Sequence, residues 1–263
     1  MTDFTELMDS FSPADDGWTV TVSDDWLQGR TVYGGLAAAL CLQGAVKSYP
    51  DLPPLRSAQV AFIGPASGAL QILPTVLRKG KSTVFAGVDL IGEAGLATRA
   101  TFCFGAARQA AFAHHVMITP DVAAPETCPD FFRNRPPGLR FVEHFDGRFA
   151  GGALPFSGAQ HPEMTLWLRH RTKVETSPMV ALLALADAPP PAASTMATTP
   201  SIISTMTWAV DMLTDRIETS DGWWLVRNAA EQIGDGYSSQ AMTVWNAQGV
   251  AVMASRQNIA VFG

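Results

Sequence analysis

The chain has 263 residues, of which 47% are apolar and only 16% are charged, whereas about 25% of a typical soluble protein is charged. This composition favours a large buried core, arranged as one large domain or two small ones. The net charge of -6 and the pI near 5.3 argue against a general affinity for nucleic acid or for an anionic membrane surface.

The cysteines and the first residues indicate where the protein works. The three cysteines are unevenly spaced and form no CxxC pair, so the sequence predicts neither a disulfide framework nor a zinc site. The first ten residues, MTDFTELMDS, are acidic where a signal peptide would be basic, and no apolar run reaches the length of a membrane span. We therefore expect a cytoplasmic protein that does not enter a membrane.

The first predicted element is an uncharged helix over residues 36–46, directly after the sequence GRTVYGG. It has no amphipathic stripe, and a helix that is apolar on all sides is normally enclosed by protein. Gly34 and Gly35 precede it. They permit a close approach of another backbone and leave helix N-H groups free, although tight packing alone explains two glycines equally well.

Strand patterns follow this helix. They cover residues 56–64, 70–77, 82–91 and 96–105, and the last two flank the turn GEAG at 92–95, which is typical of a hairpin. Residues 106–137 then combine small residues, turns and prolines without a sustained period, so we interpret them as a connection.

The same order of elements returns after the connection. Ser177 and Pro178 are a typical helix start, and residues 179–186 are again uncharged. Strand patterns follow at 201–210, 223–228, 238–247 and 250–263, with the turn NAQG at 246–249 between the last two. The two helices lie about 144 residues apart and the two turns 154 residues apart, which predicts an internal duplication.

Each half can cover its apolar helix only if an antiparallel sheet curls around it. The sequence therefore predicts an α+β protein with a double hot-dog fold. We place an N-terminal hot-dog unit at residues 1–105, the connection at 106–137 and a C-terminal hot-dog unit at 138–263.

The chain resembles the acyl-CoA thioesterase II family of double hot-dog thioesterases. The resemblance rests on GRTVYGG at the first helix, RKGKS before a strand, and TPSIISTMTW and GVAVMASRQ in the second half. It implies hydrolysis of fatty acyl-CoA thioesters without a metal, a cofactor or a covalent intermediate, coenzyme A being part of the substrate. It also implies a homo-oligomer.

The family's catalytic aspartate, hydroxyl and glutamine match Asp187, Ser201 and Gln257, which together would hold the attacking water. Ser204 and Thr205 compete with Ser201 for the hydroxyl. From the residues alone, Asp187 could equally be an exposed residue at a frayed helix end. Gln257 could equally be a polar side chain that forms a hydrogen bond with a backbone group. In related enzymes the first helix comes from the opposite half and binds the oxyanion. This implies a role for the N-H groups of Gly34, Gly35 and Leu36.

The duplication predicts one active site per chain. With the helix and turn offsets, Gln43 occupies the place of Asp187 in the first half, and Cys103 the place of Gln257. Neither residue preserves the chemistry of its counterpart.

Other functions and contacts stay open at this point. A hydratase acting on enoyl-CoA would need an Asp and His pair, for which His144 with Asp146 and His161 are the candidates. His114 and His115 could bind a metal, and a silent acyl-CoA-binding protein would need none of these residues. A serine hydrolase is excluded because no GxSxG occurs.

The cations that could contact the coenzyme A phosphates are Arg30, Arg78, Lys79, Lys81 and Arg256.

Overall fold

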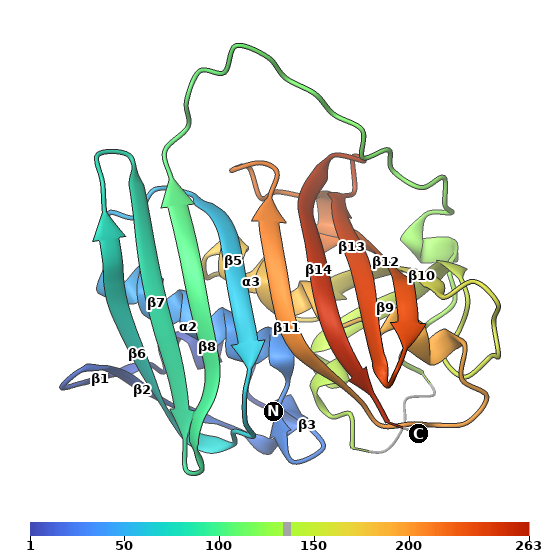
Figure 1. Cartoon of the computed structure of the whole chain (residues 1–263), viewed down its shortest axis with the longest axis horizontal. Helices are drawn as coiled ribbons and strands as arrows, with labels where there is room; N and C mark the ends of the chain where they lie inside the picture. The colour runs from blue at the N-terminus through green and yellow to red at the C-terminus, as the bar shows by residue number, and fades with distance from the viewer. Residues whose placement is uncertain (134–137, 263) are drawn as a thin grey trace.

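A single twisted antiparallel sheet runs through the whole molecule (Figure 1). The computed structural model describes residues 1–133 and 138–262, and within these residues the sheet has 12 strands. The first half of the chain contributes β1 (Ser12–Ala14), β2 (Gly17–Val22), β5 (Leu55–Phe62), β6 (Gly68–Lys79), β7 (Thr83–Gly92) and β8 (Gly95–Gly105). The second half contributes β9 (Phe145–Gly152), β10 (Glu163–His170), β11 (Ile203–Met212), β12 (Trp224–Gly234), β13 (Tyr237–Asn246) and β14 (Ala251–Val261).

The strand order shows the duplication directly. From the centre outward, β5-β8-β7-β6-β2-β1 on one side is matched by β11-β14-β13-β12-β10-β9 on the other. The two halves join where β5 pairs with β11, with Gln59 opposite Ala209. This confirms the α+β double hot-dog fold. The boundaries at 105/106 and 137/138 stay predictions, and residues 134–137 of the connection lie outside the described residues.

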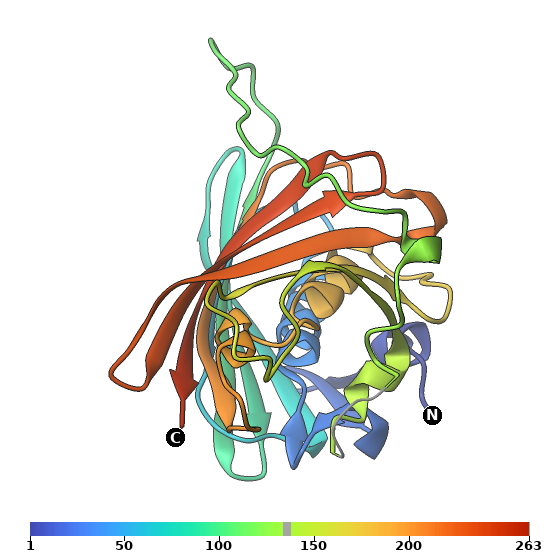
Figure 2. The ribbon, with the colours of Figure 1, turned by 90° about the vertical axis from the view of Figure 1, so that its right-hand side faces the viewer.

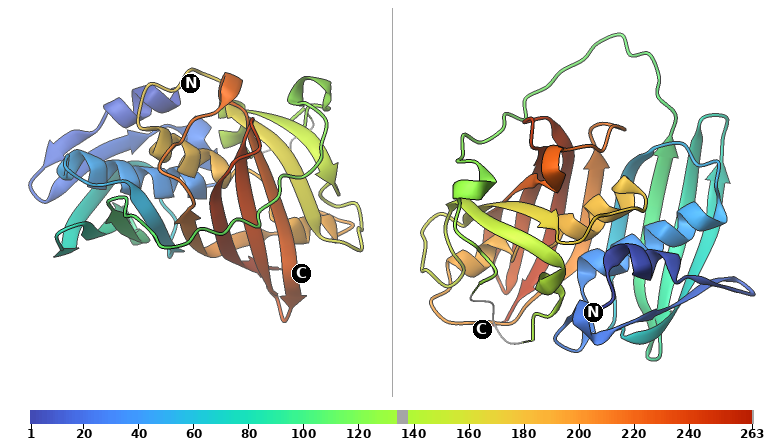
Figure 3. Two further views of the ribbon diagram at one scale, coloured as in Figure 1. Left: turned by 90° about the horizontal axis from the view of Figure 1, so that it is seen from above. Right: turned by 180° about the vertical axis from the view of Figure 1, so that it is seen from behind.

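Two helices fill the concave side of the sheet. Helices α2 (Gly34–Ser48) and α3 (Pro178–Ala186) lie side by side behind the strands, and the sheet curls around them (Figures 2 and 3). Residues 35–45 of α2 and 180–186 of α3 are buried without interruption, as expected for helices with no polar face. Both uncharged helices predicted from the sequence are therefore confirmed.

The predicted strands and hairpins are also present, with ends shifted by a few residues. Gly95 and Gly249 occupy the turns with φ values of 103° and 80°, in the left-handed region that glycine adopts without strain. Sequence patterns did not mark helix α1 (Phe4–Asp9), the two outermost strands on each side of the sheet (β1, β2, β9 and β10), or the small hairpin of β3 (Leu27–Gln28) and β4 (Thr31–Val32).

A buried cluster of aromatic rings around a contact between His144 and Asp25 joins the two units near the N-terminus. The Nε2 atom of His144 lies 3.0 Å from the Asp25 carboxylate, and both side chains are buried. The His144 ring stacks on Trp26 with a centroid distance of 3.6 Å, and the Trp26 indole N-H donates to the carbonyl of Thr2. This cluster is a structural contact between segments that lie far apart in the sequence.

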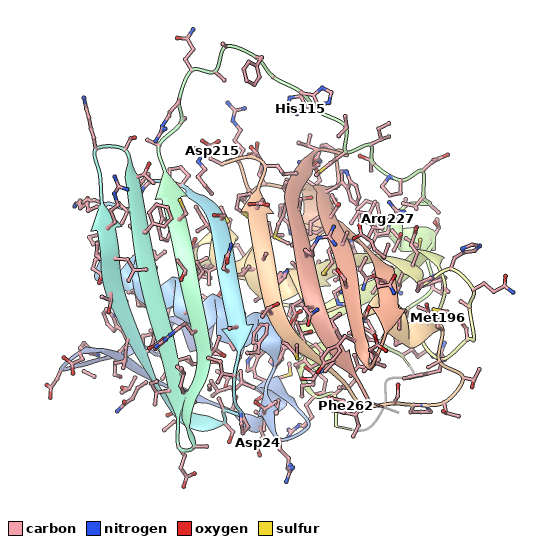
Figure 4. All side chains as sticks on the ribbon, in the orientation of Figure 1. Asp24, His115, Met196, Asp215, Arg227 and Phe262 are labelled. Atoms are coloured by element: carbon pink, nitrogen blue, oxygen red, sulfur yellow. The ribbon has the colours of Figure 1, made fainter. Side chains whose placement is uncertain are left out.

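The connection leaves the body of the protein after β8. It arches over one end of the sheet before it returns to the C-terminal unit, and His115 lies on this arch (Figure 4). Phe112, Val116 and Ile118 on the same segment are exposed. None of the helices in the described part of the chain is long and apolar enough to cross a membrane.

Candidate active site

A large cavity lies at the boundary between the two units. Its volume is about 1210 Å³, above the roughly 300–1,000 Å³ of most small-molecule sites. Segments of both units and of the connection line it, and the only charged residues among its described lining are Asp130 and Asp187. Six phenylalanines give the cavity its apolar character: Phe62, Phe131, Phe132, Phe141, Phe149 and Phe156.

Asp187 connects the two helices. It directly follows α3 as the C-cap residue, and its carboxylate accepts a hydrogen bond from the backbone N-H of Gly35 in the first turn of α2. A carboxylate at the end of its own helix is unfavourable, but here it also lies at the positive end of the neighbouring helix. The α2 dipole therefore offsets the α3 dipole at this side chain.

The glycine pair makes this contact possible. A Cβ atom on Gly34 would lie 2.8 Å from Oδ2 of Asp187, and one on Gly35 would lie 2.5 Å from the carbonyl oxygen of Ala184. The hydroxyl of Tyr33 donates to the same Ala184 carbonyl over 2.8 Å. Gly34 thus leaves room for the carboxylate, and Gly35 lets the two helices approach each other.

Gln257 holds the other side of the carboxylate. Its Nε2 donates to Oδ1 of Asp187 over 2.6 Å, and its Oε1 accepts from Nε2 of Gln240 over 2.7 Å. Gln240 in turn accepts from the backbone N-H of Ala192 over 2.8 Å. Sequence reasoning missed Gln240. The only available signal was a polar residue at a buried position of strand β13, two residues after Ser238 on the same face.

Burial changes the acidity of Asp187. The residue is half-buried because its side chain faces the cavity, while protein surrounds it elsewhere. Loss of bulk water raises the pKa of this carboxyl from its ordinary 3.8 to about 7, although the hydrogen bonds from Gln257 and Gly35 act in the opposite direction. Asp187 therefore exchanges its proton near neutral pH.

The predicted hydroxyls lie on the same cavity. Ser201, Ser204 and Thr205 all line it, at the start of β11 and just before it. No hydrogen bond joins Ser201 to Asp187 or Gln257 in the structure. The choice among the three hydroxyls, and the catalytic role of Asp187, Ser201 and Gln257, stay predictions.

The three residues predicted to bind the oxyanion differ in their surroundings. Gly34 lines the cavity, whereas the N-H of Gly35 is engaged by Asp187. Leu36 is fully buried and is not among the lining residues. Within the predicted set, Gly34 alone borders the space in which a substrate would lie.

The remaining predicted contacts are scattered. Arg78, Lys79 and Lys81 are exposed at the β6–β7 hairpin, and Arg256 forms an ion pair with Glu231. Arg30 lies between Gly29 and Thr31, which both line the cavity, and Arg256 directly precedes Gln257, which also lines it. Across residues 1–133 and 138–262, no cluster of three or more His, Cys, Asp or Glu side chains could hold a metal ion.

The counterpart of Gln257 in the first unit is Phe102, and the assignment to Cys103 was wrong. Gln257 pairs with Gln240 across β13 and β14, and the equivalent pair on β7 and β8 is Ala86 with Phe102. Cys103 points to the opposite face and is half-exposed. Counted from the turn glycine, Gln257 on β14 lies one residue further along than Phe102 on β8. The sequence separation taken from the two turns is therefore too short by one residue at this position.

Comparisons with known proteins agree with this architecture. Residues 22–105 match the model of the acyl-CoA thioesterase N-terminal domain, and residues 125–261 match that of the acyl-CoA thioesterase C-terminal domain. The chain belongs to the acyl-CoA thioesterase family. A search of curated proteins finds no match.

Solved structures of similar fold cover nearly the whole chain. A conserved protein of unknown function with a hot dog fold from Alicyclobacillus acidocaldarius has a TM-score of 0.90 at 23% identity, covering 100% of this chain and 99% of that one. The acyl-CoA thioesterase II TesB2 of Mycobacterium marinum has a TM-score of 0.77 at 17% identity, covering 98% of both chains. The tesB protein of Mycobacterium avium subs paratuberculosis has a TM-score of 0.79 at 14% identity, covering 98% of this chain and 97% of that one. At these identities the likeness establishes the fold.

The contact between the helices predicts a large effect of Gly35→Ala. The added methyl group would meet a backbone oxygen that cannot turn away, so α2 and α3 must separate. We expect a loss of about 1–3 kcal/mol in the free energy of unfolding, measured by urea denaturation. The control is Gly29→Ala, where a Cβ meets nothing within 4 Å but the φ of 66° still disfavours alanine. A smaller loss for Gly35→Ala than for this control would contradict the close helix contact.

The raised pKa of Asp187 predicts how stability depends on pH. Because the pKa is about 7 in the folded protein and 3.8 ordinarily, the folded state binds more protons between these values, and stability falls as pH rises from about 4 to about 7. Asp187→Asn removes this effect. At pH 8 we expect the free energy of unfolding of the variant to exceed that of the wild type by at most about 4 kcal/mol. About 1 kcal/mol of this gain should be lost, because asparagine offers only one acceptor oxygen to the two donors on Gln257 and Gly35.

The gain should shrink as pH falls toward 4, where the wild-type carboxyl is protonated in the folded protein. Urea denaturation of both proteins at several pH values measures this difference. A stability difference that is independent of pH would show that Asp187 is ionised throughout this range.

Proposed function

We propose that this protein hydrolyses acyl-CoA thioesters with a water molecule activated by Asp187. One observation carries the proposal. A carboxyl with a pKa of about 7 lies on the wall of a large apolar cavity, and a glutamine and a helix N-terminus hold its position. General bases work best when their pKa lies near the working pH. Membership of the acyl-CoA thioesterase family supports the same reaction.

The proposed reaction needs one proton carrier. Asp187 takes a proton from water, and the hydroxide attacks the carbonyl carbon of the thioester. When the tetrahedral intermediate collapses, the C–S bond breaks, and the thiolate of coenzyme A receives the proton from Asp187. Gln257 uses one N-H for the carboxylate and has a second with which to hold the water, and Ser201 offers a hydroxyl on the same wall.

The oxyanion would form next to the first turn of α2. Gly34 lines the cavity there, and the backbone N-H groups at a helix N-terminus carry partial positive charge. A donor that is fixed before the reaction stabilises the developing negative charge without rearrangement. We assign this donor to Gly34 in preference to Gly35, whose N-H is engaged by Asp187.

The cavity suits the acyl group better than the nucleotide part of coenzyme A. Its described lining is rich in phenylalanine and proline and contains no lysine or arginine. An acyl chain gains free energy by leaving water for such a surface, whereas phosphates would lose their hydration. The nucleotide would therefore stay outside the cavity, and Arg30, which adjoins two lining residues in the sequence, is a candidate contact for its phosphates.

The position of the histidines favours hydrolysis over hydration of an enoyl-CoA. No histidine occurs among the described residues that line the cavity. His144 pairs with Asp25 instead, in the buried cluster beside Trp26, while Asp146 forms ion pairs with Arg169 and Arg171. His161 is exposed. A hydratase that uses an Asp and His pair would need such a pair on the cavity wall.

Asp187→Asn tests the proposed base. We expect turnover to fall about 10²-fold or more with little change in KM, because the amide cannot accept a proton from water. The wild-type rate should rise with pH through a midpoint near 7. The assay is release of free thiol from acyl-CoA esters of graded chain length.

The matched control is Asp130→Asn, since Asp130 is the other carboxylate on the cavity wall. It should keep its turnover. Unchanged thiol release by Asp187→Asn would remove Asp187 from the mechanism. Formation of a 3-hydroxyacyl-CoA would identify a hydratase, and binding of acyl-CoA by the wild type without turnover would identify a silent binder.

A further inference from the structure

We propose that Gln240 is a positioning residue that fixes the orientation of the Gln257 amide and so determines which end of that amide faces Asp187. The inference rests on the proposed function of Asp187 and Gln257. Gln240 does not line the cavity and is only 1% exposed. It lies on β13 directly opposite Gln257 on β14. Its effect on the reaction would pass entirely through Gln257.

A backbone N-H group sets the direction of the hydrogen bonds that link Gln240, Gln257 and Asp187. The N-H of Ala192, at the start of the short 3-10 helix Ala192–Thr195, can only donate, so the end of Gln240 that receives it must be the oxygen. The Nε2 of Gln240 then faces Gln257 and donates to its Oε1 over 2.7 Å. This leaves Nε2 of Gln257 facing Asp187 at 2.6 Å.

This direction matters because the two ends of a glutamine amide have nearly the same shape. An N-H that faces Asp187 favours the ionised carboxylate, whereas a carbonyl in the same place would favour the protonated acid. Buried hydrogen bonds act in a low dielectric, where such a preference is strong. Gln240 therefore helps to keep Asp187 in the form that can accept a proton.

Comparison with the first hot-dog unit indicates that Gln240 and Gln257 serve the candidate active site and are not needed to form the sheet. There the positions equivalent to Gln240 and Gln257 are Ala86 and Phe102, both fully buried. The same sheet therefore forms in the first unit with an apolar pair at this point. The polar pair occurs in the unit that carries Asp187.

Gln240→Met tests the proposal, because methionine has a similar shape but cannot donate to Gln257. We expect the midpoint of the rising limb of the pH–rate profile to move up by about one unit. Turnover at pH 7 should fall several-fold with KM unchanged. Ser238→Ala is the matched control, since Ser238 is buried on the same face of β13 and lies outside this chain of hydrogen bonds. It should leave the profile unchanged.

A double-mutant cycle tests whether Gln240 acts through Gln257 or independently of it. In a Gln257→Met background, Gln240→Met should cause no further shift of the midpoint, because the residue through which it acts is gone. An additional shift in that background would overturn the proposal, as would an unchanged midpoint in the single variant. Neither result would affect the proposed function, because the Asp187→Asn variant tests that function separately.

The wild-type protein offers a second measurement that does not require a variant to fold. The side-chain amide resonances of Gln257 and Gln240 should both shift with pH in NMR spectra, with one shared midpoint near 7 set by Asp187. A Gln240 amide that does not respond while that of Gln257 does would overturn the proposal.

Discussion

The contact between the Asp187 carboxylate and the first turn of α2 is the feature on which the rest of this site depends. It joins the end of one unit's helix to the start of the other's, so the site exists only because two hot-dog units share one sheet. It also explains why two successive residues of α2 have no side chain. A methyl group on Gly34 would occupy the place of the carboxylate, and one on Gly35 would separate the helices.

Two opposing effects act on this carboxyl, and burial is the larger. The surrounding protein removes bulk water and raises the pKa, while the donors on Gln257 and Gly35 stabilise the charge and lower it. A fully exposed carboxyl would be too weak a base at neutral pH, and one buried without donors would stay protonated. The sheet supplies one donor and the opposite helix supplies the other, so the fold sets the acidity of Asp187.

The sequence predicted the elements that have strong local patterns. Both helices followed from their uncharged runs, and the central hairpins followed from alternation with glycine at the turns. The edge strands were missed because β9 is rich in glycine and β1 has only three residues, so neither shows a clear alternation. Their pairing depends on neighbours that lie far apart in the sequence.

The site could be predicted only in part, for a related reason. The family motifs pointed to Asp187 and Gln257, which the structure places 2.6 Å apart although 70 residues separate them. No sequence pattern distinguishes Gln240 from any other polar residue in a strand, because its contacts come from β14 and from the segment after α3. The error at Cys103 arose from a single extra residue, which moves a side chain to the other face of a strand.

A direct titration of the Asp187 carboxyl tests whether burial raises its pKa to about 7. Carbon-13 NMR of the wild-type protein, with Asp187→Asn used to assign the resonance, would follow its side-chain carbonyl from pH 3 to pH 9. We expect a midpoint near 7 that coincides with the midpoint of the pH–rate profile. A midpoint near the ordinary 3.8 would show that burial does not perturb the carboxyl and that Asp187 is not a base with a pKa near neutral pH.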